Sequence, residues 1–206
     1  MSAPYVWRRL TPPQREMVLR HRRLHEHPWH SPPHWSENFG HRFFLLTAAC
    51  WEHRPHLGLS PERMDHFTND WLAMLREDCV AVHAWCVLPN HYHALVETGR
   101  LPALLKRVGQ FHGRTSFAWN AEEGTRGRPN FYRCVDRAMR SESHQWVTIN
   151  YIHHNPVHHG YTTQWQDWPW SSARAWLEHH GRDEMTRLWR EYPLLEYGRG
   201  WDDAGL

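Results

Sequence analysis

The sequence contains no long apolar run, no paired-cysteine motif and almost no lysine. Its longest apolar run, residues 43–51, is far shorter than the roughly 20 residues that a membrane-spanning helix requires. The first ten residues include paired arginines but no apolar segment of the kind found in export signals. The four cysteines form no CxxC pair, so nothing indicates an oxidising compartment. We therefore expect a soluble, unexported chain with reduced thiols, located in the cytoplasm.

Tryptophan, histidine and arginine are abundant instead. The chain has 14 Trp and 20 His, and Lys106 is the only lysine among its 24 basic residues. The net charge of +2 combines two basic segments, 1–35 (six Arg, two Glu) and 99–140 (nine basic, three acidic residues), with an acidic one, 176–206 (four basic, seven acidic residues). Arginine pairs with phosphates and aromatic rings stack on unpaired bases, so the composition slightly favours a single-stranded nucleic acid as partner. A GC-rich genome and a Trp-filled core are the alternative explanation.

The length of 206 residues predicts one core with additions at both ends. Prolines at positions 28, 32 and 33 separate an N-terminal segment from the rest of the chain. We predict a basic N-terminal arm over residues 1–35, a core domain over residues 36–175 and an acidic C-terminal tail over residues 176–206.

The hydrophobic periodicity of the core predicts four strands and three helices. The strands are expected over residues 43–50, 80–88, 91–97 and 130–135. The helices are expected from Ser60-Pro61 through Leu75, over residues 101–120 and over residues 141–154. This order, βαββαβ followed by one helix, predicts an α+β protein with a ferredoxin-like antiparallel sheet, in which the third strand is central.

His91 and His93 are candidate metal ligands on the third predicted strand. Because side chains alternate along a strand, the two imidazoles share one face and Tyr92 points to the other. A chain with 20 histidines contains such pairs by chance, and His25 and His27 are one of them. The first pair lies among apolar residues of a hairpin, where a surface histidine is not expected, whereas the second lies in a polar arm.

Tyr151 and Asn155 form the second candidate constellation. They are four residues apart and therefore lie on one face of the last predicted helix, which we expect Pro156 to end. A tyrosine hydroxyl beside a metal ion is a competent nucleophile towards a phosphodiester, and an amide oxygen could complete the ligands. Taken alone, the pair is better explained by a half-buried helix residue and a C-terminal cap.

Several motifs together resemble a known family. In order they are Leu88-Pro89-Asn90-His91-Tyr92-His93, a basic helix, an aromatic strand, Tyr151-Ile152-xx-Asn155-Pro156-Val157 and Asp167-Trp168-Pro169-Trp170-Ser171-Ser172. This order and spacing, over residues 39–175, resemble the single-tyrosine HUH transposases and, among them, the REP-associated tyrosine transposases of bacteria. Residues 197–202 (YGRGWD) also resemble the tail of some members.

The resemblance implies a function and a set of site residues. It implies that residues 36–175 form a transposase catalytic domain, in which His91, His93 and Asn155 contact a divalent ion, magnesium or manganese, and Tyr151 is the catalytic nucleophile. The family cleaves and joins single-stranded DNA beside a hairpin: the tyrosine becomes linked to a 5′-phosphate and a 3′-hydroxyl is released. The chain departs from the family pattern at His158-His159-Gly160, where a basic residue and Ala are common.

The residue types alone, without the resemblance, select neither one metal ion nor one set of DNA contacts. Two imidazoles ordinarily suit an ion softer than magnesium, which leaves manganese, zinc and nickel open, and only the resemblance favours magnesium or manganese. For DNA binding we select five basic residues, each of which could equally be a solvated surface charge: Lys106, Arg107, Arg114, Arg133 and Arg137. The oligomeric state, monomer or homodimer, is left open.

Two other classes of protein were weighed. A non-catalytic protein that binds hairpin DNA or RNA could use the same sheet with aromatic strands, but it would not need the two His, Tyr and Asn to converge. A zinc hydrolase could use histidine clusters, but the chain lacks an HExxH motif, and such an enzyme gives Tyr151 no clear role.

Overall fold

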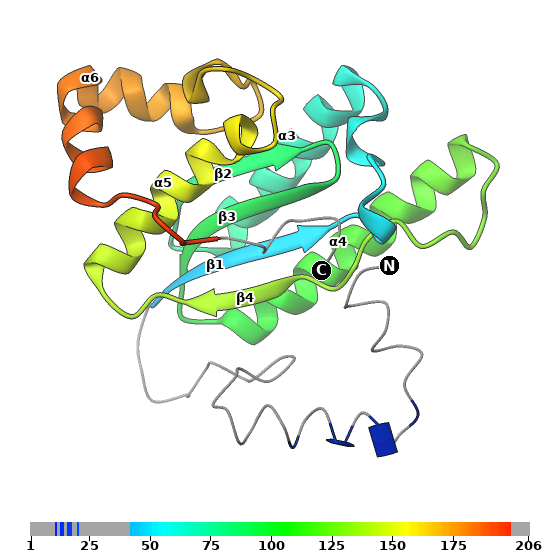
Figure 1. Cartoon of the computed structure of the whole chain (residues 1–206). Helices are drawn as coiled ribbons and strands as arrows, with labels where there is room; N and C mark the ends of the chain where they lie inside the picture. Colours follow the sequence, from blue (N-terminus) through cyan, green and yellow to red (C-terminus); the bar gives the residue numbers. More distant parts are fainter. Residues whose placement is uncertain (1–10, 12, 15, 18–19, 21–41, 199–206) are drawn as a thin grey trace.

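The computed structural model describes residues 11, 13–14, 16–17, 20 and 42–198. Four strands form one antiparallel sheet in the order β2-β3-β1-β4 (Figure 1). The strands are β1 (Arg42–Ala49), β2 (Ala81–Leu88), β3 (His91–Thr98) and β4 (Val135–Ala138). The predicted ferredoxin-like α+β fold is therefore confirmed, with β3 inside the sheet. The predicted arm over residues 1–35, with His25 and His27, lies almost entirely outside the described residues.

Within residues 42–198, four helices accompany the sheet. They are α3 (Pro61–Asp78), α4 (Leu101–Glu122), α5 (Glu142–His158) and α6 (Ala173–Glu191), with short 3-10 turns η1 (Trp51–His53), η2 (Leu57–Leu59) and η3 (Trp165–Asp167). Side-chain caps explain two of the starts. The Ser60 hydroxyl accepts a hydrogen bond from the Arg63 amide, and the Ser141 hydroxyl accepts one from the His144 amide. Among the described residues, no helix is long and apolar enough to cross a membrane.

The two faces of the sheet carry different helices. Alternate residues of β1, among them Phe44 and Leu46, pack in one core with α3 and α4. Their neighbour Leu45 packs in a second core with Ile149 and Ile152 of α5. Figure 1 shows α5 on the opposite side of the sheet from α3 and α4. A residue of the sheet therefore belongs either to the α3/α4 face or to the α5 face.

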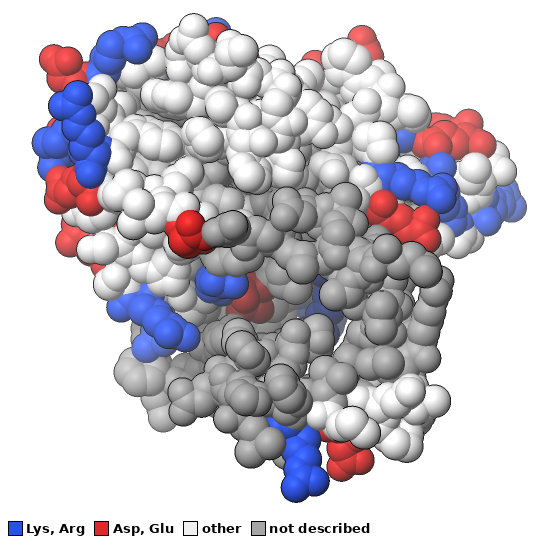
Figure 2. Space-filling view, in the orientation of Figure 1, with Lys and Arg blue, Asp and Glu red and all other residues white. Residues whose placement is uncertain are grey.

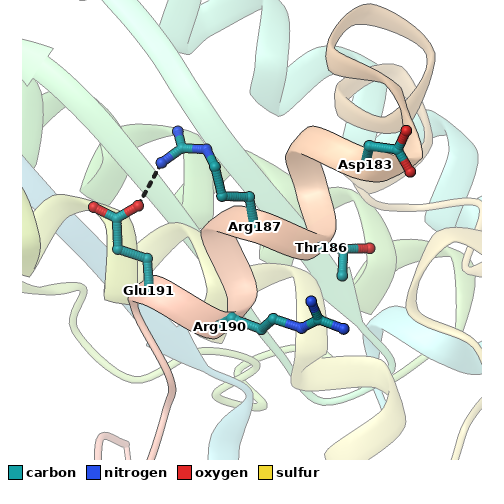
Figure 3. A pocket seen from close by; sticks show the side chains of 5 residues that line it. All are labelled: Asp183, Thr186, Arg187, Arg190 and Glu191. Atoms are coloured by element: carbon teal, nitrogen blue, oxygen red, sulfur yellow. Dashed lines mark hydrogen bonds and ion pairs between the residues drawn. The ribbon is translucent and has the colours of Figure 1, made fainter.

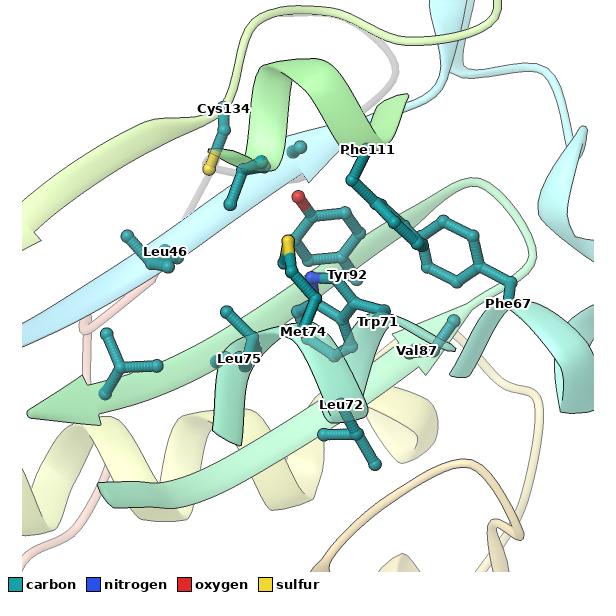
Figure 4. Close-up of a cluster of buried hydrophobic side chains, with 14 of the residues drawn as sticks. Leu46, Phe67, Trp71, Leu72, Met74, Leu75, Val87, Tyr92, Phe111 and Cys134 are labelled. Carbon is teal, nitrogen blue, oxygen red and sulfur yellow. The ribbon is translucent and has the colours of Figure 1, made fainter. Parts of the chain in front are cut away.

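Tyr92 is part of the α3/α4 core, as strand alternation predicts. Its ring lies 4.4 Å from that of Trp71 and 5.9 Å from that of Phe67 (Figure 4). Its hydroxyl lies 2.9 Å from Nε2 of His112, and burial lowers the pKa of His112 to about 4. This packing holds the strand segment that carries His91 and His93.

The prediction for the fourth strand was wrong in its boundaries. Strand β4 begins at Val135, whereas the sequence predicted a strand over residues 130–135. The preceding residues form an isolated bridge, Phe131 with Cys50, and not a continuous strand, and their side chains make tertiary contacts. The buried amide of Asn130 donates to the Asn120 side chain, and Phe131 stacks on His112 with ring centroids 4.3 Å apart. Aromatic and β-branched composition does not distinguish such a core-packing segment from a strand.

The expectation that Pro156 ends the last core helix was also wrong, because α5 continues to His158. Proline has no backbone N–H to donate, and near the end of a helix this removes one hydrogen bond without ending the helix. The His159 amide still donates to the Asn155 carbonyl, and the Tyr161 amide donates to the carbonyl of Pro156 itself. The boundary predicted between residues 175 and 176 falls inside α6.

Candidate active site

His91 and His93 lie side by side on β3 and face α5. Both side chains are buried, and their ring centroids are 5.0 Å apart. Their register partners on β1 are Ala49 and Thr47. The strand therefore presents two imidazoles on the face opposite the aromatic core, as the alternation of the sequence predicts.

A side-chain oxygen orients each imidazole. Nδ1 of His91 lies 2.7 Å from Oδ1 of Asn90, and Nδ1 of His93 lies 2.8 Å from the hydroxyl of Thr47. When Nδ1 carries the proton and donates it to this oxygen, Nε2 carries the lone pair. Metal-binding histidines in proteins are commonly held in this way, by a partner on the other ring nitrogen.

Helix α5 brings Asn155 and Tyr151 to the same place. Oδ1 of Asn155 lies 2.9 Å from Nε2 of His91. The ring of Tyr151, one helical turn earlier, meets the ring of His93 edge-on at 5.2 Å between centroids. The structure thus assembles the four residues that the sequence singled out for catalysis and metal binding, although β3 and α5 are far apart in the chain.

The donor atoms fit a divalent metal ion. Two imidazole nitrogens and one amide oxygen are suitable ligands for manganese and for other first-row ions. Nε2 of His91 and Oδ1 of Asn155 lie 2.9 Å apart, close enough for both atoms to contact one ion. In the described part of the chain no three His, Cys, Asp or Glu side chains form a metal-binding group, and the set proposed here has two histidines with Asn155 as its third member.

The C-terminal segment covers the nucleophile candidate. Tyr151 is only 5% exposed, and its ring packs against Tyr197 at 5.7 Å between centroids. The Tyr197 hydroxyl contacts Nε2 of His144 at 3.1 Å and also the hydroxyl of Thr148. Burial raises the pKa of Tyr197, against the opposing effects of Thr148 and of the Arg137 charge. Residues 197–198 had only a sequence motif to mark them, and their contact with Tyr151 could not be inferred from it.

His159 is a further neighbour of the site that the sequence did not identify. Its ring lies 4.9 Å from that of His91, at the end of α5. It is one of the residues at which the chain departs from the family pattern, so the motif comparison drew attention to the position but not to its role.

The motif at residues 167–172 supports the site from the edge of the sheet. The Val87 amide donates to the Trp170 carbonyl, and Ser172 and Trp85 pair through the Ser172 amide and hydroxyl. The Ser172 hydroxyl also lies 2.9 Å from Nε2 of His153, and burial lowers the pKa of this histidine to about 3. The segment thereby extends the sheet beside β2 and ties it to α5.

The five basic residues selected for DNA binding lie on two different sides of the sheet. Lys106, Arg107 and Arg114 lie on α4, the helix that covers the face opposite the site. Arg107 is paired with Glu77 at 3.0 Å and with Asp78 at 3.4 Å. Arg137 is in register with Leu45 on β1 and therefore points to the α5 face. Arg133 is exposed and lies just before β4.

Other charged side chains form mixed clusters. Figure 2 shows acidic and basic residues interspersed over α6 and beyond the end of α4. Five residues of α6 line a shallow hollow (Figure 3): Asp183, Thr186, Arg187, Arg190 and Glu191. Arg187 pairs there with Glu184 and Glu191, so its charge is compensated within the helix. The hollow contains none of the assembled histidine, tyrosine and asparagine side chains.

Comparison with known proteins identifies a fold. No protein-family model and no curated protein matches the chain. One solved structure is similar: a REP-associated tyrosine transposase bound to a REP hairpin, with a TM-score of 0.52 and 18% sequence identity. The similarity covers 66% of this chain and 79% of the transposase. The two proteins therefore share a fold, and this chain has the architecture of a REP-associated tyrosine transposase.

Proposed function

We propose that the protein is a metal-dependent endonuclease and strand transferase for single-stranded DNA, acting beside a hairpin through a 5′-phosphotyrosine intermediate. The observation that carries the proposal is the convergence of His91, His93 and Asn155, with the ring of Tyr151 against that of His93. The fold supports it, because the similar transposase is bound to a REP hairpin. Both lines of support are independent of the composition of the chain.

The residues of the chain suggest how the reaction would proceed. His91, His93 and Asn155 would hold magnesium or manganese, which when bound neutralises phosphate oxygens and polarises the scissile bond. The Tyr151 hydroxyl attacks phosphorus, the phosphorus–O3′ bond breaks and the phenol proton is transferred overall to the released 3′-oxygen. The 5′-phosphate remains on Tyr151. Attack by a 3′-hydroxyl on this ester would reverse the step and join strands without a nucleotide cofactor.

Thr47 and Asn90 would act as supporting residues. Their oxygens hold Nδ1 of His93 and of His91, and thereby set the direction of both rings. Arg133 and Arg137, on or beside β4, are the proposed phosphate contacts nearest to the site face, whereas Lys106, Arg107 and Arg114 would contact DNA that reaches the α4 side.

The test is a search for a covalent adduct. The protein is mixed with hairpin DNA taken from the flanks of its own gene, with a single-stranded extension and with manganese or magnesium. The proposal predicts a cut strand and a protein–DNA adduct that resists denaturation and is absent with duplex DNA. Cleavage that leaves the 5′-phosphate free of protein would instead indicate attack by water. Binding without any cleavage would indicate a non-catalytic hairpin-binding protein.

A further inference from the structure

We propose that Tyr161 and Trp168, on the segment that joins α5 to α6, form a stacking site for an unpaired base of the DNA strand that enters the site. The inference rests on the proposed function and assigns a substrate contact to residues outside the His/Tyr/Asn cluster. In Figure 1 this segment follows the end of α5 and leads back past β2 to α6.

A continuous series of rings leads from the metal-ligand candidates to this segment. The His91 ring lies 4.9 Å from that of His159, which lies 6.3 Å from that of Tyr161. Tyr161 in turn lies 5.4 Å from Trp168, and their planes differ by 34°. Trp168 lies 5.1 Å from Trp170. A strand bound at Tyr151 therefore has aromatic surface beside it on the α5 side.

The rings are held in place by backbone contacts. The Tyr161 amide donates to the Pro156 carbonyl, and the turn before it uses Gly160 at a φ of 72°. The Trp168 indole N–H donates to the Val87 carbonyl at 2.9 Å, and Trp170 donates to Asp65. These contacts hold the backbone at Tyr161 and the rings of Trp168 and Trp170, so less conformational entropy remains to be lost when a base stacks.

Tyr161 is accessible to such a base. It is 41% exposed, although burial of the remainder raises the pKa of its hydroxyl. Its hydroxyl makes no hydrogen bond to the residues that the structure describes. A large aromatic side chain that is fixed at its backbone and exposed at its ring is a suitable platform for a nucleobase.

The charge of the segment indicates a base and not a phosphate. Between positions 155 and 170 the only Asp, Glu, Lys or Arg is Asp167. Phosphates are bound by Arg and Lys, whereas base stacking requires an aromatic face and tolerates any sequence. The proposed phosphate contacts of β4 and the rings of this segment would thus bind different parts of one strand.

The proposal is tested by measuring the dissociation constant of the complex between the full-length protein and a twelve-nucleotide oligodeoxythymidylate. Loss of a stacking side chain removes a large part of the affinity for one base, so Tyr161→Leu should weaken binding by about tenfold. Tyr161→Phe and Tyr161→Trp retain an aromatic face and should bind as the wild type does. Leucine preserves apolar packing on Trp168, and the thermal transition of each variant verifies folding.

Two controls separate stacking from other effects. Phe117, 79% exposed on α4, is a matched aromatic outside the segment, and Phe117→Leu should leave the affinity unchanged. A twelve-residue abasic strand keeps the phosphates but has no bases, so wild type and Tyr161→Leu should bind it equally. The proposal is overturned if the wild type does not bind the oligothymidylate, if Tyr161→Leu binds it as well as the wild type, or if the abasic strand shows the same loss. A missing covalent adduct would overturn the proposed function and leave this binding result intact.

Discussion

Gly198 lies directly against the ring of Tyr151. A Cβ atom at position 198 would lie 2.2 Å from Cε2 and 2.5 Å from Cδ2 of the tyrosine, and the glycine has a φ of 80°. Both the close approach and the left-handed backbone require glycine. The backbone near the C-terminus is therefore shaped to the side chain that we propose as the nucleophile.

Gly198→Ala should detach this segment from Tyr151. The added methyl group cannot be accommodated while the ring stays in place, so the Tyr197 amide, which donates to the Leu194 carbonyl, should exchange its hydrogen faster. Hydrogen exchange read by NMR measures this. Gly124→Ala is the matched control, because Gly124 has a φ of 65° but no atom near its Cβ position. It should cost about 1 kcal/mol of unfolding free energy and leave Tyr197 unchanged. Equal exchange in both variants would contradict the contact.

Tyr151→Phe should bind hairpin DNA about as well as the wild type and form neither a nick nor an adduct. The change removes the attacking oxygen and preserves the ring that packs on His93 and Tyr197. Tyr132→Phe and Tyr192→Phe, which alter hydroxyls outside the cluster, should still cleave. Residual nicking by Tyr151→Phe would show that another group attacks.

Thr47→Val should weaken metal binding without removing a ligand. The change replaces the hydroxyl that lies 2.8 Å from Nδ1 of His93 with a methyl group of similar size. Loss of such a supporting contact typically reduces metal affinity 10- to 100-fold. Calorimetric titration with manganese measures the effect. His91→Ala should abolish both binding and cleavage, and His25→Ala should change neither. If Thr47→Val binds manganese as the wild type does, His93 is not oriented by this contact.

Acid should destabilise the protein through its buried imidazoles. Burial lowers the pKa of His112 from 6.5 to about 4. Between these two pH values the imidazole is protonated in the unfolded chain and neutral in the folded chain, so protonation favours unfolding. The contribution of His112 to stability is complete above pH 6.5 and is lost as the pH falls towards 4. The unfolding free energy, measured with urea between pH 4 and 7, should therefore rise with pH, and His112→Gln should reduce the slope of this rise. His179→Gln, which alters an exposed histidine of α6, should keep the slope. An unchanged slope in His112→Gln would assign the effect to other groups.

Arg137 and Arg107 should differ in their effect on DNA binding. Arg137 points to the site face, so Arg137→Ala should weaken hairpin binding and reduce the salt dependence of the affinity by about one unit of slope. Arg107 lies on the opposite side and is paired with Glu77 and Asp78, so Arg107→Ala should change the slope less. The two variants are compared by measuring the dissociation constant between about 50 and 200 mM salt, across which phosphate contacts make the affinity fall steeply. A larger effect of Arg107 would place the DNA on the α4 side.

Local patterns in the sequence determined the elements and the faces of the site. Ser-Pro and Ser-x-x-His starts mark α3 and α5, because a serine hydroxyl can cap the next helical turn. Alternation along β3 placed His91 and His93 together and Tyr92 opposite, and the spacing of four residues placed Tyr151 above Asn155. These rules depend only on the geometry of a strand or a helix, so they hold wherever the element itself is identified correctly.

Tertiary structure decided what the local patterns could not. Oδ1 of Asn155 meets Nε2 of His91 across 64 positions of sequence, and Gly198 meets Tyr151, because α5 and the C-terminal segment pack on the same face of the sheet. The start of β4 likewise depends on partners distant in sequence, because Phe131 just before it packs on His112. The continuation of α5 through Pro156 depends on backbone hydrogen bonds that form only after the chain has turned. The side on which Arg137 lies follows from sheet register, and that of Arg107 and Arg114 follows from the packing of α4; composition contains neither. Residue types, their periods and the family resemblance were therefore sufficient to select the candidate site residues, whereas the covering of Tyr151 and the sides on which the selected arginines lie required the packed fold.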